Sequence, residues 1–194
     1  MLIESSDSPE QETRRLQLYQ IESSHPDWWF FPPEPRSKVQ GFRGTGKIFI
    51  VGDQPSPARF EHNDKSRRLF YDLLADVNAG DCHLTDLYKR RGARGELEYA
   101  ITQGIDPKKH PDFAEHLKVF LWEVNLLAPS TVLALGERAF KLLSKYTPEL
   151  IERGIVLKQV WHFAVVGYGR DEDEKSQRRS EFGNRLRSAI RAAR

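Results

Sequence analysis

Two carboxylates and one imidazole directly follow apolar runs that the sequence predicts as β-strands. They are Asp53, Asp86 and His162, after the runs 47–52, 82–85 and 155–161. In an open parallel sheet the carboxyl ends of the strands lie along one edge, where ligands bind, so we expect these side chains to share a crevice. A carboxylate and an imidazole together support acid–base or electrostatic chemistry. Each residue alone could also cap a turn or be a satisfied, half-buried histidine, so the prediction rests on the three together.

Several other kinds of catalytic site are absent from the sequence. There is no glycine-rich phosphate loop, no Gly-x-Gly-x-x-Gly after the first strand and no Gly-x-Ser-x-Gly turn. His62 and His83 have no partner at an interval typical of metal ligands. Cys82 is the only cysteine, which excludes an intramolecular disulfide and a thiolate cluster for zinc or iron–sulfur. We therefore expect a site without metal, iron–sulfur cluster or other cofactor.

The charge of the chain gives only a weak indication of its partner. The 194 residues include 30 Lys and Arg and 28 Asp and Glu, for a formal net charge of +2. Basic residues gather in 89–94 and 178–194, which are either solvated surface or contacts to nucleic acid. The sequence shows neither a signal-peptide pattern nor an apolar run near the roughly 20 residues of a membrane span. We expect a cytoplasmic monomer that does not bind membranes.

The elements that would position these side chains alternate between strand and helix. Strands are predicted near 47–52, 82–85, 131–135 and 155–161, and helices near 65–78, 111–128, from 136 onward and 176–193. This alternation predicts an α/β domain over 41–194, built as a three-layer α/β/α sandwich around a central, mostly parallel, four-stranded sheet.

Residues 1–40 differ in character from that domain. The stretch from Ser8 to Gln11 matches a capping box with proline at the first helical position, which predicts a helix over 9–21. The segment 25–35 then combines four consecutive aromatic residues with prolines that exclude a regular helix. We expect an arm whose aromatic side chains pack against its own domain. Stacking on exposed bases and docking to a partner are the alternatives.

Three motifs surround the predicted sheet edge. They are Gly52-Asp53-Gln54-Pro55, Leu84-Thr85-Asp86-Leu87-Tyr88-Lys89-Arg90-Arg91 and the stretch LLAPSTVLALG at 126–136, followed by a histidine after the last strand. The region 45–165 that contains them resembles the uracil-DNA glycosylase superfamily. It is most similar to the branch whose first motif is Gly-Glu-Ala-Pro-Gly. That branch carries an iron–sulfur cluster on four cysteines, which this chain lacks.

The resemblance implies an enzyme that flips a damaged or mismatched base out of DNA and hydrolyses its N-glycosidic bond. In that family Asp53 takes the place of the acid that positions or activates water, and His162 that of the histidine that hydrogen-bonds the departing base. Asp86 falls where an asparagine reads the edge of uracil. Gln54 is a further candidate for base contact, and His62 lies roughly where a phenylalanine stacks on the flipped base. The residues expected to hold the DNA backbone are Lys89, Arg90, Arg91 and Arg94.

Two departures from the family pattern bear on this activity. The last motif is usually His-Pro-Ser, whereas here it reads His162-Phe163-Ala164, and Phe163 could wedge into a base step or belong to the core. An ionised Asp86 would only accept hydrogen bonds, so it would repel a carbonyl and favour an amino group or a ring N–H. Three explanations stay open: a changed base preference, a protonated Asp86, or lost catalysis.

Two other functions fit the same sequence. A chain that keeps the fold without catalysis would bind nucleic acid with strong salt dependence and release no base. A different α/β enzyme would turn over free nucleosides or nucleotides and have no measurable affinity for oligonucleotides.

Overall fold

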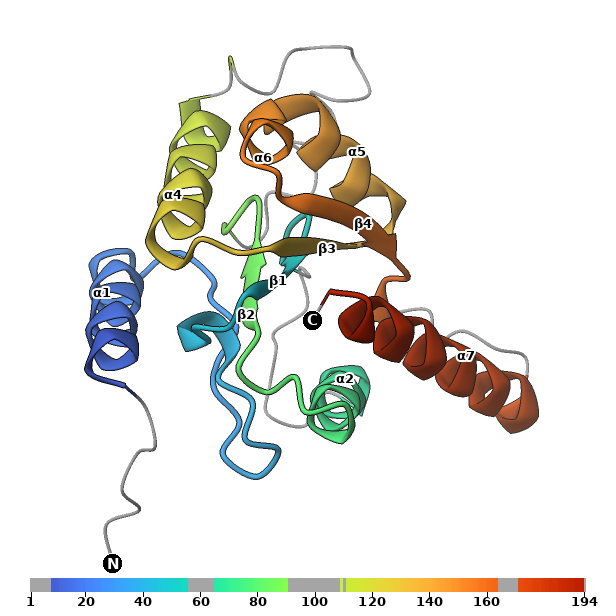
Figure 1. The fold of residues 1–194 in the computed structure, drawn as a ribbon. Coiled ribbons are helices and arrows are strands. Elements are labelled where there is room, and N and C mark those ends of the chain that lie inside the picture. The colour runs from blue at the N-terminus through green and yellow to red at the C-terminus, as the bar shows by residue number, and fades with distance from the viewer. Residues whose placement is uncertain (1–7, 56–64, 91–108, 110, 164–170, 194) are drawn as a thin grey trace, which may run out of the picture.

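The computed structural model describes residues 8–55, 65–90, 109, 111–163 and 171–193. Its centre is one sheet of four parallel strands in the order β2-β1-β3-β4 (Figure 1). The strands are β1 (Ile48–Gly52), β2 (His83–Asp86), β3 (Thr131–Leu135) and β4 (Val156–Val160). The predicted α/β architecture with a central parallel sheet is therefore confirmed.

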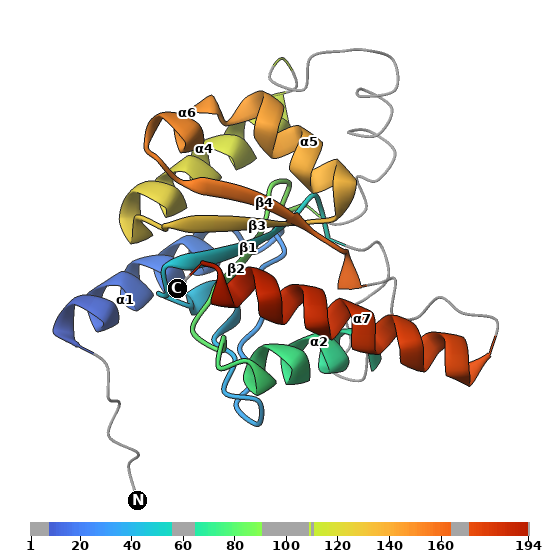
Figure 2. The same cartoon turned by 45° about the vertical axis from the view of Figure 1, so that its right-hand side comes forward.

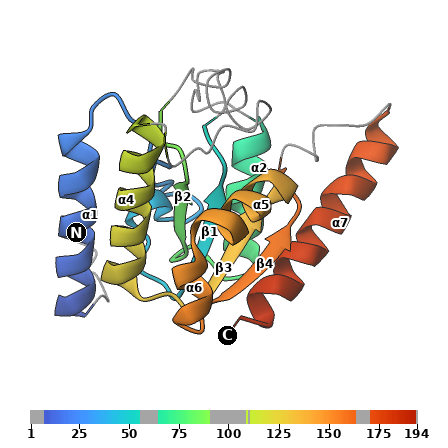
Figure 3. The same ribbon diagram turned by 90° about the horizontal axis from the view of Figure 1, so that it is seen from above.

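Helices cover both faces of this sheet. They are α1 (Pro9–Ser24), α2 (Lys65–Asp76), α4 (Pro111–Leu127), α5 (Gly136–Tyr146), α6 (Pro148–Glu152) and α7 (Glu172–Arg191), with a short 3-10 turn η1 (Gly41–Arg43). Helices α2 and α7 lie on one side of the sheet, and α4, α5 and α6 on the other (Figure 2). Helix α1 packs beside α4 at the outside of that second layer (Figure 3).

The alternation of side chains along the strands explains why the sheet needs both layers. In β1, Phe49 and Val51 join the apolar core under α4 and α5, whereas Ile48 and Ile50 join the core under α2 and α7. All five residues of β1 are buried, as a strand covered on both faces requires. The continuous apolar run in the sequence is therefore the direct signature of this central position.

Most predicted elements agree with the structure to within about three residues at their ends, and three differences have a clear physical reason. Strand β2 includes Asp86 as its last residue, so this carboxylate belongs to the strand rather than following it. Helix α7 begins at Glu172, four residues before the predicted start, because the side chain of Asp171 accepts a hydrogen bond from the N–H of Glu174 (2.8 Å). The short helix α6 was not predicted, since five residues are too few for a periodic pattern.

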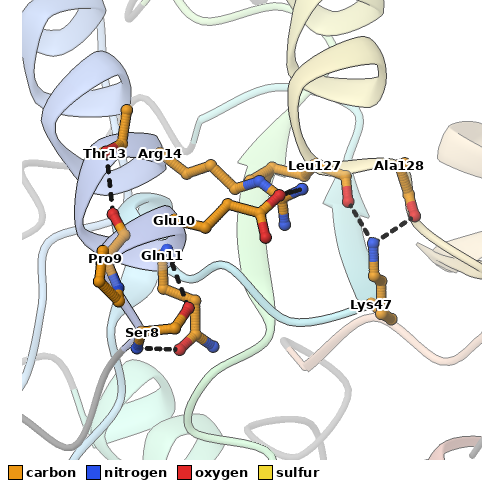
Figure 4. Close-up of polar contacts among 9 residues, drawn as sticks. All are labelled: Ser8, Pro9, Glu10, Gln11, Thr13, Arg14, Lys47, Leu127 and Ala128. Atoms are coloured by element: carbon orange, nitrogen blue, oxygen red, sulfur yellow. Dashed lines mark hydrogen bonds and ion pairs between the residues drawn. The ribbon is translucent and has the colours of Figure 1, made fainter.

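The N-terminal helix begins as its capping box predicts. The N–H of Gln11 donates to Oγ of Ser8 (3.3 Å), and the N–H of Ser8 donates to Oε1 of Gln11 (2.9 Å) (Figure 4). The same close-up shows Lys47, just before β1, donating to the main-chain carbonyls of Leu127 (3.0 Å) and Ala128 (3.2 Å). This contact ties the amino end of β1 to the end of α4.

The aromatic arm is pinned to its own domain. Phe30 is buried in the core under α4 and α5, and its neighbour Phe31 is buried in the core under α2 and α7. The expectation that the arm packs on its own domain is confirmed for these two residues. In the described part of the chain, no helix has both the length and the apolar character that crossing a membrane requires.

After β2 the chain crosses to the opposite side of β1. From β1 it passes to β2 on one side, and then returns to place β3 on the other side of β1. The carboxyl ends of β1 and β3 therefore flank a switch point, the place where open α/β sheets bind ligands.

Candidate active site

Backbone hydrogen bonds hold the ends of β1 and β2 side by side. The N–H of Leu87 donates to the carbonyl of Gly52 (2.9 Å), and that of Tyr88 to the carbonyl of Asp53 (3.0 Å). Gly52 leaves room for the carboxyl group of Asp86, because a Cβ atom there would lie only 2.0 Å from Oδ1 of Asp86. The carboxyl groups of Asp53 and Asp86 are close enough for the charge of one to act on the other.

Asp53 makes an ion pair across the switch point. Its Oδ2 lies 3.0 Å from Nε of Arg138, with 15% of the Asp53 side chain and 33% of the Arg138 side chain exposed. Arg138 is the third residue of α5, which begins at Gly136 as soon as β3 ends. The sequence contains a signal for this cation, because Glu137 and Arg138 are the first charged residues after the third apolar run.

His162 follows β4 and lies against the junction between β3 and α5. Gly136 has a φ of +90°, and a Cβ atom there would lie 3.3 Å from Cβ of His162. The imidazole stacks on Phe163 with ring centroids 4.5 Å apart. Burial lowers the pKa of His162 below its usual value, although the negative charge of Asp53 partly opposes this effect. At neutral pH the side chain is therefore a neutral imidazole with one N–H to donate.

Asp86 is almost completely buried, with 4% of the residue exposed. Burial raises the pKa of its carboxyl well above the usual value; the charge of Asp53 adds to this, Lys89 opposes it, and Glu123 adds a smaller increase. Among the residues that the structure describes, its buried Oδ2 has no hydrogen-bond partner. Oδ2 of Asp86 is therefore polar, enclosed and unsatisfied within the described residues.

Gln54 carries a second unsatisfied atom at the same edge. Its Oε1 is buried and likewise has no hydrogen-bond partner within the described part of the chain. A buried polar atom without a partner costs about 1–3 kcal/mol, so native proteins rarely retain one without a reason. A ligand that hydrogen-bonds to Gln54 and Asp86 would supply that reason.

The expectation that Lys89 contacts DNA phosphates is wrong. None of its side chain is exposed. Its Nζ donates to the main-chain carbonyl of Asp86 (2.7 Å) and lies 3.0 Å from Oε1 of Glu123. A run of basic residues does not reveal which of them turns inward, and here α4 supplies a buried carboxylate that draws Lys89 into the interior.

Lys89 belongs to a buried ionic cluster beneath the site, formed with Glu123 and His83. Oε2 of Glu123 lies 3.3 Å from Nε2 of His83. Burial is the largest influence on Glu123 and opposes its ionisation, but Lys89 and His83 together outweigh it and lower the pKa of Glu123. The cluster joins β2 to α4 and fixes the backbone at Asp86. His83 appeared in the sequence as a histidine without a partner, because Glu123 lies forty residues away.

The remaining predicted contact residues are only partly described. Arg90 is exposed, with 53% of its side chain accessible, and its Nη1 donates to Oδ2 of Asp112 (3.0 Å). Its position allows contact with a phosphate. The candidates His62, Arg91 and Arg94 lie outside the described residues.

Phe163 belongs to the core. It is buried among the side chains under α2 and α7 and stacks on Phe70 with ring centroids 5.1 Å apart and planes 17° apart. This contact holds the segment after β4 against α2, so Phe163 positions His162 and does not project as a wedge.

The assembled edge therefore carries one carboxylate paired with Arg138, one neutral imidazole, one buried carboxyl and one buried amide oxygen. These groups can orient water beside a developing cation and donate a hydrogen bond to a developing anion. Among the described residues, no three His, Cys, Asp or Glu side chains are arranged to hold a metal ion.

No protein-family model matches the chain, and a search of curated proteins finds no similar sequence.

Proposed function

We propose that this protein is a DNA glycosylase of the uracil-DNA glycosylase superfamily, acting as a monomer on a base flipped out of DNA. The observation that carries the proposal is the meeting of Asp53 and His162 at the carboxyl edge of the sheet, where the charge of Asp53 acts on both His162 and Asp86. Of the motifs that resemble the superfamily, the first begins at the last residue of β1, the second covers the end of β2, and the third runs from the end of α4 through β3.

Hydrolysis of an N-glycosidic bond builds positive charge on the sugar and negative charge on the departing base. The Asp53 carboxylate would face the sugar, stabilise its oxocarbenium character and orient the attacking water, as carboxylates do in glycoside hydrolysis. Its ion pair with Arg138 fixes the direction of the carboxylate. The order of events needs no covalent enzyme intermediate: the bond to the base breaks, water adds to the sugar carbon, and its proton leaves toward Asp53.

His162 would act on the base. A neutral imidazole donates its N–H to a base oxygen, where negative charge accumulates as the bond breaks. Burial favours that neutral form, because it lowers the pKa of His162. One such donor is worth about 3–4 kcal/mol in the transition state, by analogy with oxyanion-stabilising groups.

Abasic-site formation on labelled oligonucleotides tests the proposal. Single- and double-stranded substrates would carry uracil, hypoxanthine, xanthine, oxidised pyrimidines or mismatched normal bases. We expect release of at least one of these bases, with Asp53→Asn reducing the rate by about 100-fold or more. Asp76→Asn is the matched control, because Asp76 is exposed on α2.

Two other outcomes would replace this function with another. Tight, salt-sensitive binding without release of any base would indicate a nucleic-acid-binding module that keeps the fold. Turnover of free nucleosides or nucleotides without affinity for oligonucleotides would indicate a different α/β enzyme.

A further inference from the structure

In the described chain, two carboxylates and one ammonium act on the carboxyl group of Asp86. Asp53, directly after β1, is one of these carboxylates, and it already pairs with Arg138. Glu123, on α4, is the second carboxylate. The one buried ammonium nearby in the described chain, Lys89, directs its hydrogen bonds to the main-chain carbonyl of Asp86 and to Glu123.

An anion is therefore poorly accommodated at this position. A buried charge is tolerated when it is paired and hydrogen-bonded, and like charges close together disfavour the ionisation of one of them. Asp86 is enclosed, its Oδ2 has no partner among the described residues, and both neighbouring carboxyl groups repel negative charge. The direction of its pKa, raised mainly by burial, agrees with this geometry.

We propose that Asp86 works as a neutral carboxylic acid whose Oδ2–H donates a hydrogen bond to a carbonyl oxygen of the flipped base. The inference rests on the proposed glycosylase function and says how this site distinguishes an oxo group from an amino group on the base, although its side chain is a carboxyl group and not an amide. No covalent step is involved, and the proton stays on Asp86.

The chemistry of deamination explains why the proton on Asp86 decides which bases the site accepts. Loss of an amino group converts cytosine to uracil, adenine to hypoxanthine and guanine to xanthine, and in each case an acceptor oxygen replaces a donor N–H₂. A neutral carboxyl group presents an O–H donor to that oxygen, whereas a carboxylate presents only acceptors and would select the amino group. Protonated Asp86 thus offers the donor that an amide side chain would offer, and rejects the normal base because two donors would face each other.

The protonation state of Asp86 can be measured without any catalysis. The ¹³Cγ chemical shift of Asp86, assigned by its loss in Asp86→Asn, would be followed in the intact protein from about pH 5 to about pH 8. We expect the shift to stay at the value of a carboxylic acid throughout this range. An Asp86 signal at the carboxylate value across the range would overturn the inference.

Base selectivity of variants gives the second, independent measurement. Binding and base release would be compared for uracil and cytosine in otherwise identical oligonucleotides. We expect the wild-type protein to prefer uracil, Asp86→Asn to keep that preference within about tenfold because its amide supplies the same donor, and Asp86→Ala to lose it. A wild-type preference for cytosine that Asp86→Asn reverses would show an ionised Asp86 and contradict the inference.

The two proposals fail in different ways. If Asp86 is neutral but Asp53→Asn has no effect on base release, the assigned catalytic role is wrong while the inference on Asp86 stands. If Asp53→Asn abolishes release and Asp86 is ionised, the glycosylase stands and the inference on Asp86 is wrong.

Discussion

At the scale of single residues, burial favours the uncharged form of two groups in the candidate site. It raises the pKa of Asp86 and lowers that of His162. Asp53 is partly exposed and pairs with Arg138. Two donors and one anion are the combination that a cationic sugar and an anionic leaving base require.

The lowered pKa of His162 predicts how stability depends on pH. Between about pH 6.5 and the lower pKa of the folded state, the unfolded chain binds a proton on this histidine while the folded chain does not, so the free energy of unfolding falls as the pH decreases through this window. We expect His162→Gln to lose less stability than the wild-type protein between about pH 7 and about pH 5. Urea unfolding at several pH values measures this difference. Identical pH dependence in both proteins would show that His162 titrates normally.

The sequence allowed four of the site residues to be predicted but not the contacts between them. Asp53, Asp86 and His162 could be found because each stands at the end of an apolar run, and Gln54 followed from the motif that contains Asp53. Arg138 was missed and Lys89 was assigned to the wrong role, because the direction of a long side chain depends on the element packed against it. For Lys89 that element is α4, whose Glu123 lies far away in the sequence.

At the scale of elements, the end of β2 is held from two sides. The buried ionic cluster joins it to α4, and the arm pairs with the chain after it: the N–H of Trp29 donates to the carbonyl of Lys89, and Trp28 forms an isolated antiparallel bridge with Arg90. Asp86 stands between these two attachments and the closely packed Gly52. The position of its carboxyl group therefore depends on α4, the arm and β1, which lie outside the motif that contains Asp86.

The buried ionic cluster predicts a sharp difference between two adjacent basic residues. Lys89→Met leaves Glu123 buried with one partner fewer and is expected to lower the free energy of unfolding by about 3–5 kcal/mol. Arg90→Met, on an exposed residue with a surface ion pair, is the matched control and should cost about 1 kcal/mol or less. Adding Glu123→Gln to Lys89→Met should restore part of the loss. Equal, small effects at both positions would show that Lys89 is not buried and paired.

At the scale of the whole molecule, the N-terminal residues are part of the same structure as the sheet. Leu18 of α1 and Phe30 of the arm are buried in the core under α4 and α5, and Phe31 is buried in the other core. Composition separated 1–40 from 41–194, but packing joins the two. Local patterns predicted helix α1 and the order of strands and helices; the route of an aromatic, proline-rich arm depends on long-range contacts that no local pattern encodes.

Two leucines on α1 test whether this helix shares the core of the domain. Leu18 has no exposed surface, whereas 57% of Leu16 is exposed. We expect Leu18→Ala to lower the free energy of unfolding by about 2–5 kcal/mol, because it leaves a cavity between α1 and the domain. Leu16→Ala should change it by about 0.5 kcal/mol or less. Comparable effects in urea unfolding would mean that α1 does not share the core of the domain.

The rate of base release in a single turnover tests the central claim most directly. It would be measured for the wild-type protein, Asp53→Asn, His162→Asn and the surface control Asp76→Asn, each on the oligonucleotide that carries the preferred base. We predict losses of about 100-fold or more for the first two variants and an unchanged rate for the control. Wild-type rates in both Asp53→Asn and His162→Asn would contradict the assignment of this sheet edge as the active site.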